Sequence, residues 1–113
     1  MKMSHLSQIQ DLKQKECMAH PSARYLVSKI FREFSVSAVE RSRVYAVHSR
    51  EDALKEAVGL IGDFDLSKTK FAEERPVEGK EGDPAMNAAI AHLAENQRIK
   101  LGDFTIEIDN LEN

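Results

Sequence analysis

The sequence has no tryptophan and a single cysteine, Cys17, and both scarcities limit what the protein can be. One cysteine cannot form an internal disulfide, which excludes a disulfide-stabilised scaffold and fits a reducing compartment. No stretch is long and apolar enough to span a membrane, and the opening residues, MKMSHLSQIQ, lack the apolar segment of a secretory signal. We therefore expect a cytoplasmic protein with no membrane association.

Motifs that would identify a reaction are also missing. The sequence contains no glycine-rich phosphate loop, no nucleophile elbow and no pair of cysteines at metal-binding spacing. Adjacent carboxylates such as Glu73 and Glu74 lie in a polar stretch, where nothing suggests the desolvation that tunes a catalytic acid. We predict that the protein is not an enzyme and that it uses no cofactor.

Two patterns match metal sites in part. Residues 63–74 place oxygen-bearing side chains at the ligand positions of a calcium loop, and Glu74 falls where the bidentate ligand is needed. However, Lys68 occupies the position of the sharp turn, which requires glycine, and Pro76 prevents the exit helix. Cys17 and His20 have ligand-like spacing, but a structural zinc site needs four ligands. We expect no metal at either place.

The composition is that of an ordinary soluble globular protein. The chain has 113 residues, of which 42% are hydrophobic and 31% are charged. This length allows one domain with a modest core, built from aliphatic residues and five phenylalanines. We expect residues 1–113 to form a single domain.

The charge of the chain is divided between its two halves. Residues 1–50 carry nine lysines and arginines against four acids, a net charge of +5, whereas residues 51–113 carry seven against fifteen, a net charge of −8. This asymmetry predicts either a charged partner or two halves that attract each other.

Two stretches in the first half have the apolar spacing of amphipathic helices. The first runs from Ser4, a potential cap, to about Met18. The second, residues 23–34, has the clearer pattern, because its apolar residues form one continuous stripe. Its opposite face would carry Arg24, Tyr25, Lys29 and Arg32.

Two further helices are predicted in the second half. Ser49 precedes two acids at the start of a helix that Gly62 is well placed to end. Asp83 followed by Pro84 supplies a cap and a first-turn proline for an alanine-rich helix that reaches about Asn96.

Strands are predicted in two places. Ser37 and Glu40 could form a capping box, but residues 43–47 are rich in β-branched and aromatic side chains, so we favour a strand there. Near the C-terminus, apolar alternation on both sides of Gly102-Asp103 predicts a type II′ hairpin over residues 99–108. The alternative is a helix that ends at Gly102, followed by one strand at 104–108. The predicted fold class is α+β, with three to four amphipathic helices packed on a small antiparallel sheet that includes a C-terminal strand or hairpin.

Residues 63–83 lack clear periodicity and contain Pro76, Gly79 and Gly82. A long connection inside a small domain is often functional or mobile. We predict a mobile acidic loop here, with its tip at residues 80–82.

Nucleic-acid binding is one function that the charge pattern allows. The basic face predicted for residues 23–34, with further arginines close after it, could bind phosphates. A helix followed by a hairpin, residues 84–108, also has the local outline of a winged helix. That helix is alanine-rich and lies in the acidic half, which disfavours contact with phosphates. Nucleic-acid binding by a transcriptional regulator is therefore the alternative function and not the preferred one.

Protein recognition is the function that the sequence favours. A small, mildly acidic chain without catalytic motifs suits a regulatory protein, inhibitor or adaptor that binds another protein through complementary charge. Tyrosines beside arginines are typical of interface hot spots. A small sheet can complete its edge with a second copy, so we also expect a homodimer. The candidate partner-binding residues are Arg24, Tyr25, Lys29, Arg32, Arg41, Arg43, Arg50, Asp63, Asp65, Glu73 and Glu74.

Overall fold

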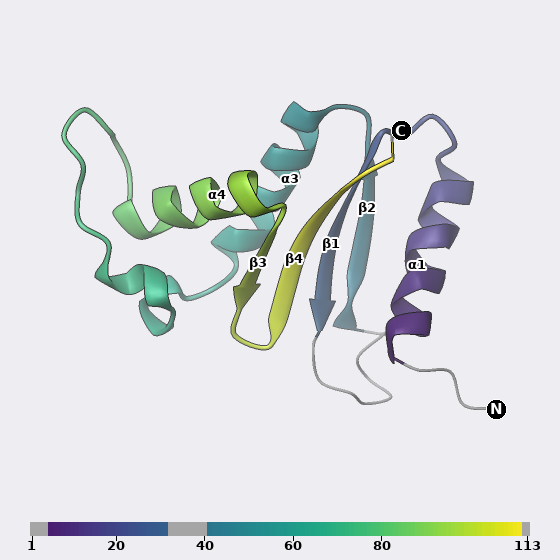
Figure 1. Cartoon of the computed structure of the whole chain (residues 1–113), viewed down its shortest axis with the longest axis horizontal. Coiled ribbons are helices and arrows are strands. Elements are labelled where there is room, and N and C mark those ends of the chain that lie inside the picture. Colours follow the sequence, from purple (N-terminus) through teal and green to yellow (C-terminus); the bar gives the residue numbers. More distant parts are fainter. Residues whose placement is uncertain (1–4, 32–40, 112–113) are drawn as a thin grey trace.

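The computed structural model describes residues 5–31 and 41–111 of the chain. In this part of the chain, three α-helices, two short 3-10 helices and four strands follow one another (Figure 1). In chain order these are α1 (His5–Ala19), β1 (Tyr25–Phe31), β2 (Arg43–Val47), α3 (Arg50–Gly62), η1 (Leu66–Lys68), η2 (Lys70–Glu73), α4 (Pro84–Asn96), β3 (Arg98–Leu101) and β4 (Phe104–Asn110).

The four strands form one antiparallel sheet in the order β2-β1-β4-β3. The two central strands, β1 and β4, pair along their whole length, from Tyr25 opposite Asn110 to Phe31 opposite Phe104. The shorter strands β2 and β3 form the two edges. The α+β fold class and the C-terminal hairpin are therefore confirmed.

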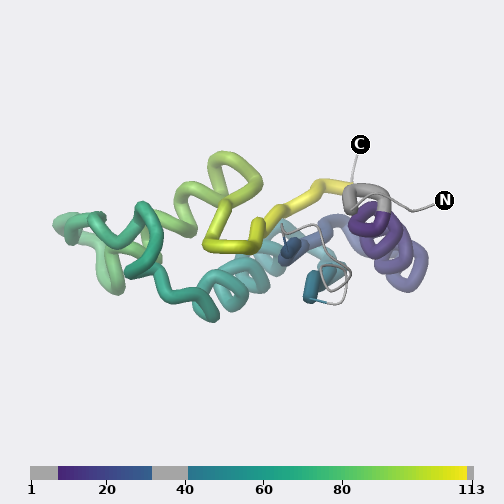
Figure 2. Tube along the Cα trace, turned by 90° about the horizontal axis from the view of Figure 1, so that it is seen from below, coloured from purple at the N-terminus to yellow at the C-terminus, as the bar shows by residue number. Residues whose placement is uncertain are grey.

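Helices cover both faces of the sheet (Figure 2). On one face α1 packs against β1 and β2, and on the other α3 packs against β1 and β4 while α4 packs against β3. Most buried side chains belong to the layer between the sheet and the helices α3 and α4. Among them are Val27, Ile61, Leu93, Leu101 and Ile106, each no more than 1% exposed. No helix of the described residues could cross a membrane.

The helix predicted for residues 23–34 is wrong, because residues 25–31 form the central strand β1. Leu26, Val27 and Ser28 are consecutive and all buried, since helices cover both faces of this strand. A strand covered on both faces has a nearly continuous apolar run, which periodicity cannot distinguish from a buried helix. The β-branched and aromatic residues of this stretch favoured the strand. Residues 32–34 lie outside the described part.

The other predicted helices are confirmed. The structure has α1 over 5–19, close to the prediction, although its proposed cap Ser4 lies outside the described residues. At the start of α3, the Ser49 side chain accepts a hydrogen bond from the Asp52 amide at 3.0 Å. At the start of α4, the Asp83 carboxylate accepts one from the Ala85 amide at 3.0 Å. These two caps satisfy amides that a helix start leaves without partners.

The predicted strands are also confirmed. β2 occupies residues 43–47, while the competing capping box at Ser37 and Glu40 falls outside the described part. The C-terminal hairpin has Gly102 at φ +61°, and Asp103 has no positive φ, which fits a type II′ turn. The alternative of a helix ending at Gly102 is wrong, because β3 pairs with β4 there.

Residues 63–83 are more structured than predicted over their first half. Two short 3-10 helices, η1 and η2, bury Leu66 and Phe71. The Phe71 ring lies edge-on to His92 of α4, with ring centroids 5.7 Å apart. From Glu74 to Gly82 every residue is exposed and no helix or strand forms. The predicted mobility of this segment stays a prediction.

Candidate interaction surface

Three phenylalanine rings meet at one end of the sheet. Phe31 ends β1 and Phe104 begins β4, and the pairing of these strands places the two residues opposite each other. Their ring centroids are 5.1 Å apart, and the Phe64 ring, which follows α3, lies 5.6 Å from Phe104. Aromatic pairs at such distances pack favourably beyond the area that they bury.

Two cations lie on these rings. The Lys29 ammonium is 4.6 Å from the centre of the Phe104 ring and 5.3 Å from that of Phe64. The Arg41 guanidinium is 3.9 Å from the centre of Phe31 and 5.5 Å from that of Phe104. We call Lys29, Phe31, Arg41, Phe64 and Phe104 the cationic cluster.

The positive charges of the cationic cluster have no acidic partner within the described residues. No carboxylate of residues 5–31 or 41–111 forms a salt bridge with Lys29 or Arg41. Arg41 is exposed, whereas Lys29 is partly buried. Each cation–aromatic contact contributes roughly 0.5–2 kcal/mol, depending on how much water is excluded. The rings thus hold both cations in place without neutralising them.

The other predicted basic residues do not share a helix face with Lys29. Arg24 precedes β1 and Arg50 begins α3, so both lie at the end of the sheet where Tyr25 pairs with Val47. Arg43 pairs with Lys29 at the opposite end. The prediction of one basic helical surface is wrong, because β1 is a strand whose successive side chains alternate between two faces. Arg32 lies outside the described residues.

The predicted hot-spot role of tyrosine is weakened by burial. Tyr25 is partly buried and packs against the main core, and Tyr45 of β2 does the same. Both lie on the sheet face that α3 covers, because Tyr25 is two residues before buried Val27 on β1 and Tyr45 pairs with Val27 from β2.

The predicted acidic residues serve local structure or stay exposed. Asp63 caps the end of α3. The Asp65 carboxylate accepts hydrogen bonds from the side chain and the amide of Ser67, and these bonds lower the pKa of Asp65. Glu73 and Glu74 are exposed at the end of η2. No group of three His, Cys, Asp or Glu side chains in the described part is arranged to hold a metal ion.

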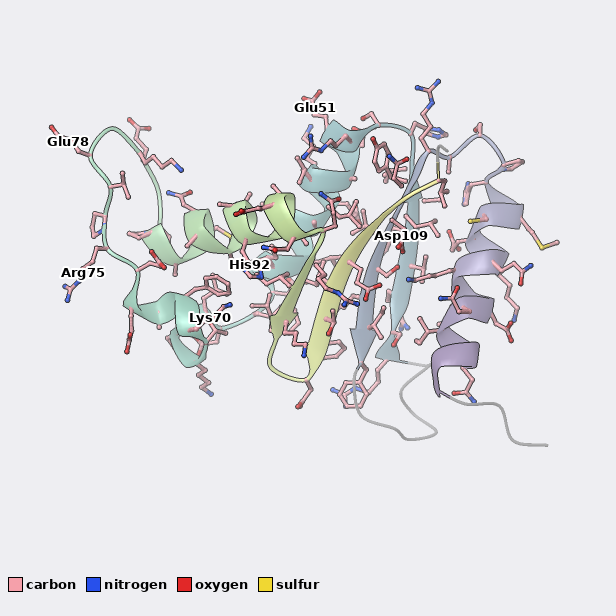
Figure 3. All side chains as sticks on the ribbon, in the orientation of Figure 1. Glu51, Lys70, Arg75, Glu78, His92 and Asp109 are labelled. Atoms are coloured by element: carbon pink, nitrogen blue, oxygen red, sulfur yellow. The ribbon has the colours of Figure 1, made fainter. Side chains whose placement is uncertain are left out.

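A partly buried ion-pair network on the opposite sheet face was missed by the sequence reasoning. The Lys13 ammonium in α1 lies 3.1 Å from Glu107 and 2.9 Å from Asp109, both of β4. Asp109 lies on the side of β4 that faces α1 (Figure 3). Arg98 of β3 donates a second hydrogen bond to Glu107. One attraction expected between the basic and acidic halves is thus a contact inside the fold.

The network shifts the titration of its members. Burial lowers the pKa of Lys13, but its hydrogen bonds to Asp109 and Glu107 outweigh burial, so this pKa lies above the ordinary value. Burial raises the pKa of Glu107, but hydrogen bonds from Arg98 and Lys13 outweigh it, so this pKa lies below the ordinary value. The ionised forms therefore predominate at neutral pH.

The three rings of the cationic cluster, Phe31, Phe64 and Phe104, were also missed as interaction residues. The signal for Phe104 was available, since the predicted hairpin begins its second strand there. This signal places Phe104 near Lys29 only if residues 25–31 form a strand. In a strand Lys29 and Phe31 lie on the same face, and Phe31 pairs with Phe104. Phe64 follows a helix end, and nothing in its local sequence indicates which rings it meets.

Comparisons with known proteins add no assignment. No protein-family model, curated protein or solved structure matches the chain.

Proposed function

We propose that the chain is a small regulatory protein that binds an acidic segment of another protein through the cationic cluster. One observation carries the proposal: Lys29 and Arg41 both lie over the Phe104 ring, and no carboxylate of the described residues pairs with either cation. A carboxylate of a partner would supply a negative charge to these two cations.

The arrangement suits an interface hot spot. Arginine and aromatic residues carry much of the binding free energy at protein interfaces. The Arg41 guanidinium lies over the Phe31 ring and the residue is exposed, so a carboxylate could accept two hydrogen bonds from its N–H groups. A side chain that is already held in place loses less conformational entropy on binding.

Nucleic-acid binding is the second candidate, because rings beside cations also stack bases and contact phosphates. The distribution of charge supports it less. Arg24 and Arg50 lie at one end of the β1–β2 pair, and Lys29 and Arg41 lie at the other, about 15–20 Å away at the rise of a strand. In addition, Ala89 and Leu93 of the would-be recognition helix α4 are buried in the core.

The test is affinity capture from a lysate of the source cells with the full chain as bait. The double variant Lys29→Met/Arg41→Ala removes both charges of the cationic cluster, and Met keeps most of the lysine stem. The matched control, Lys100→Met/Arg75→Ala, removes two exposed charges elsewhere. Arg75 projects from the 74–82 segment, far from the sheet (Figure 3).

We expect a protein that the wild type and the control retain and the double variant loses. With that protein purified, the dissociation constant should rise about 30-fold in the double variant, which corresponds to roughly 2 kcal/mol. A titration with mixed-sequence DNA and RNA separates the alternative. Micromolar, steeply salt-dependent binding that the double variant abolishes would replace protein recognition by nucleic-acid binding.

A further inference from the structure

The outer edge of β2 has backbone groups directed away from the sheet. The Phe31 amide donates to Ser42 Oγ on the β2 side, so alternation directs the backbone groups of Val27 and Lys29 toward β2 as well. The backbone N–H and C=O groups of their partners on β2, Tyr45 and Arg43, are directed back toward β1. Val44 and Ala46 therefore present their N–H and C=O groups to the outer edge, where no described strand pairs with them.

The two ends of this edge carry opposite charge. At the start of β2, residues 41–43 contain two arginines and no acid. Beyond its other end, residues 50–56 contain two bases and three acids, and Glu51 projects from the start of α3 (Figure 3). An open groove of about 300 Å³ lies between that end of β2 and α3. It is lined by Ala46, Val47, His48, Asp52, Lys55 and Glu56.

We propose that the β2 edge is a homodimer interface, in which β2 of a second copy pairs antiparallel with it and extends the sheet across a two-fold axis at Tyr45. In this register Val44 pairs with Ala46 of the second copy, and Ala46 with its Val44. All outward backbone groups of the two residues are then satisfied. The two Tyr45 side chains lie directly opposite each other, as a cross-strand aromatic pair.

The charges of the two copies complement each other in the same register. Arg43 comes to lie opposite Val47 of the second copy, on the sheet face that α3 covers. It therefore reaches the groove whose carboxylates are Asp52 and Glu56. The groove also contains Lys55 and His48, so with a neutral histidine its net charge is −1 and it attracts the guanidinium. Antiparallel pairing makes this contact twice.

The experiment is sedimentation of the full chain from micromolar to millimolar concentration. We expect the mass to rise from the 12.7 kDa of a monomer to twice that value. Ala46→Pro removes an outward N–H without touching the bonds to β1 and should yield a monomer. Lys100→Pro is the matched control, since Ile108 donates to Gln97 and alternation directs the Lys100 N–H outward on the other edge. This control should stay dimeric.

A charge exchange tests the interface without a proline. Arg43→Glu and Asp52→Arg should each raise the dimer dissociation constant by roughly tenfold, and combining them should restore most of the affinity. A wild type that is monomeric throughout overturns the proposal. So does a dimer that survives Ala46→Pro, or a double exchange no tighter than the single variants. The Lys29→Met/Arg41→Ala variant should stay dimeric, so loss of partner binding and loss of dimerisation are distinguishable.

Discussion

The ammonium of Lys13 in α1 donates to the carboxylate of Glu107 in β4 over 3.1 Å, although 94 residues separate the two in sequence. This contact ties the first described helix to a central strand of the sheet. Both side chains are largely buried, with 13% and 16% of their surface exposed. Water therefore screens the pair less than it would screen an ion pair on the surface.

Removing Lys13 should destabilise the fold. Lys13→Met keeps the apolar stem but leaves Glu107 with Arg98 alone and removes the cation beside Asp109. We expect the free energy of unfolding to fall by about 1–3 kcal/mol, because partly buried carboxylates lose a charged donor. Urea denaturation measures this. Lys15→Met, at an exposed position of the same helix, should change it by less than about 0.5 kcal/mol. Equal effects would show that the network contributes no stability.

Stability should decrease in acid as Glu107 becomes protonated. Its folded-state pKa lies below the ordinary 4.5, so the unfolded chain binds the proton first. The contribution is fully present above about pH 4.5 and is lost as the pH falls through the folded pKa. Urea denaturation at several pH values gives the free energy of unfolding as a function of pH. This free energy should change less steeply with pH for Glu107→Gln than for the wild type. Glu78→Gln, at an exposed position, should keep the wild-type slope.

Ser28, inside β1, and Ser42, just before β2, should respond in opposite ways to alanine. Ser28 is fully buried, and its hydroxyl has no hydrogen-bond partner among the described residues, so Ser28→Ala should leave the free energy of unfolding unchanged or raise it by up to about 1 kcal/mol. The Ser42 hydroxyl accepts from the buried Phe31 amide at 3.0 Å. Ser42→Ala should cost about 1–2 kcal/mol. Thermal and urea unfolding of both variants test the contrast, and a larger loss for Ser28→Ala contradicts it.

Alanine should also have opposite effects at two glycines. Gly102 has φ +61° in the hairpin turn, a conformation that strains a residue with a Cβ, so Gly102→Ala should destabilise by about 1–2 kcal/mol. Gly59 lies inside α3, where an added Cβ meets nothing within 4 Å. Gly59→Ala should stabilise by about 0.5–1 kcal/mol, because alanine favours a helix. Melting temperatures that move in the same direction would contradict the assigned turn.

Local chemistry explains which elements the sequence predicted. Ser49 and Asp83 are caps whose partners lie two or three residues away in sequence. The turn at Gly102 depends on the positive φ of that residue, which glycine adopts without strain. The identity of β1 depends instead on what covers its two faces, which a window of sequence does not contain. For the same reason Lys13 could not be assigned to Glu107, because their proximity follows from the packing of α1 on the sheet.

In the candidate surface, too, the local sequence indicates some features and tertiary packing determines the others. The sequence indicates Lys29 and Arg41 by their charge alone. The rings that position them come from β1, from β4 and from Phe64, two residues beyond the end of α3, and only tertiary packing brings these together.

The pairing of β1 with β4 has a consequence for synthesis on the ribosome. Tyr25 can pair with β4 only after Asn110 has been synthesised. More than eighty residues are added after Tyr25 before this side of β1 can be completely paired. Chains grow at about 5–20 residues per second, so this apolar strand stays open on that side for several seconds. During that interval the nascent chain offers a site for chaperones, and sheet closure has to follow late, long-range contacts that slow folding.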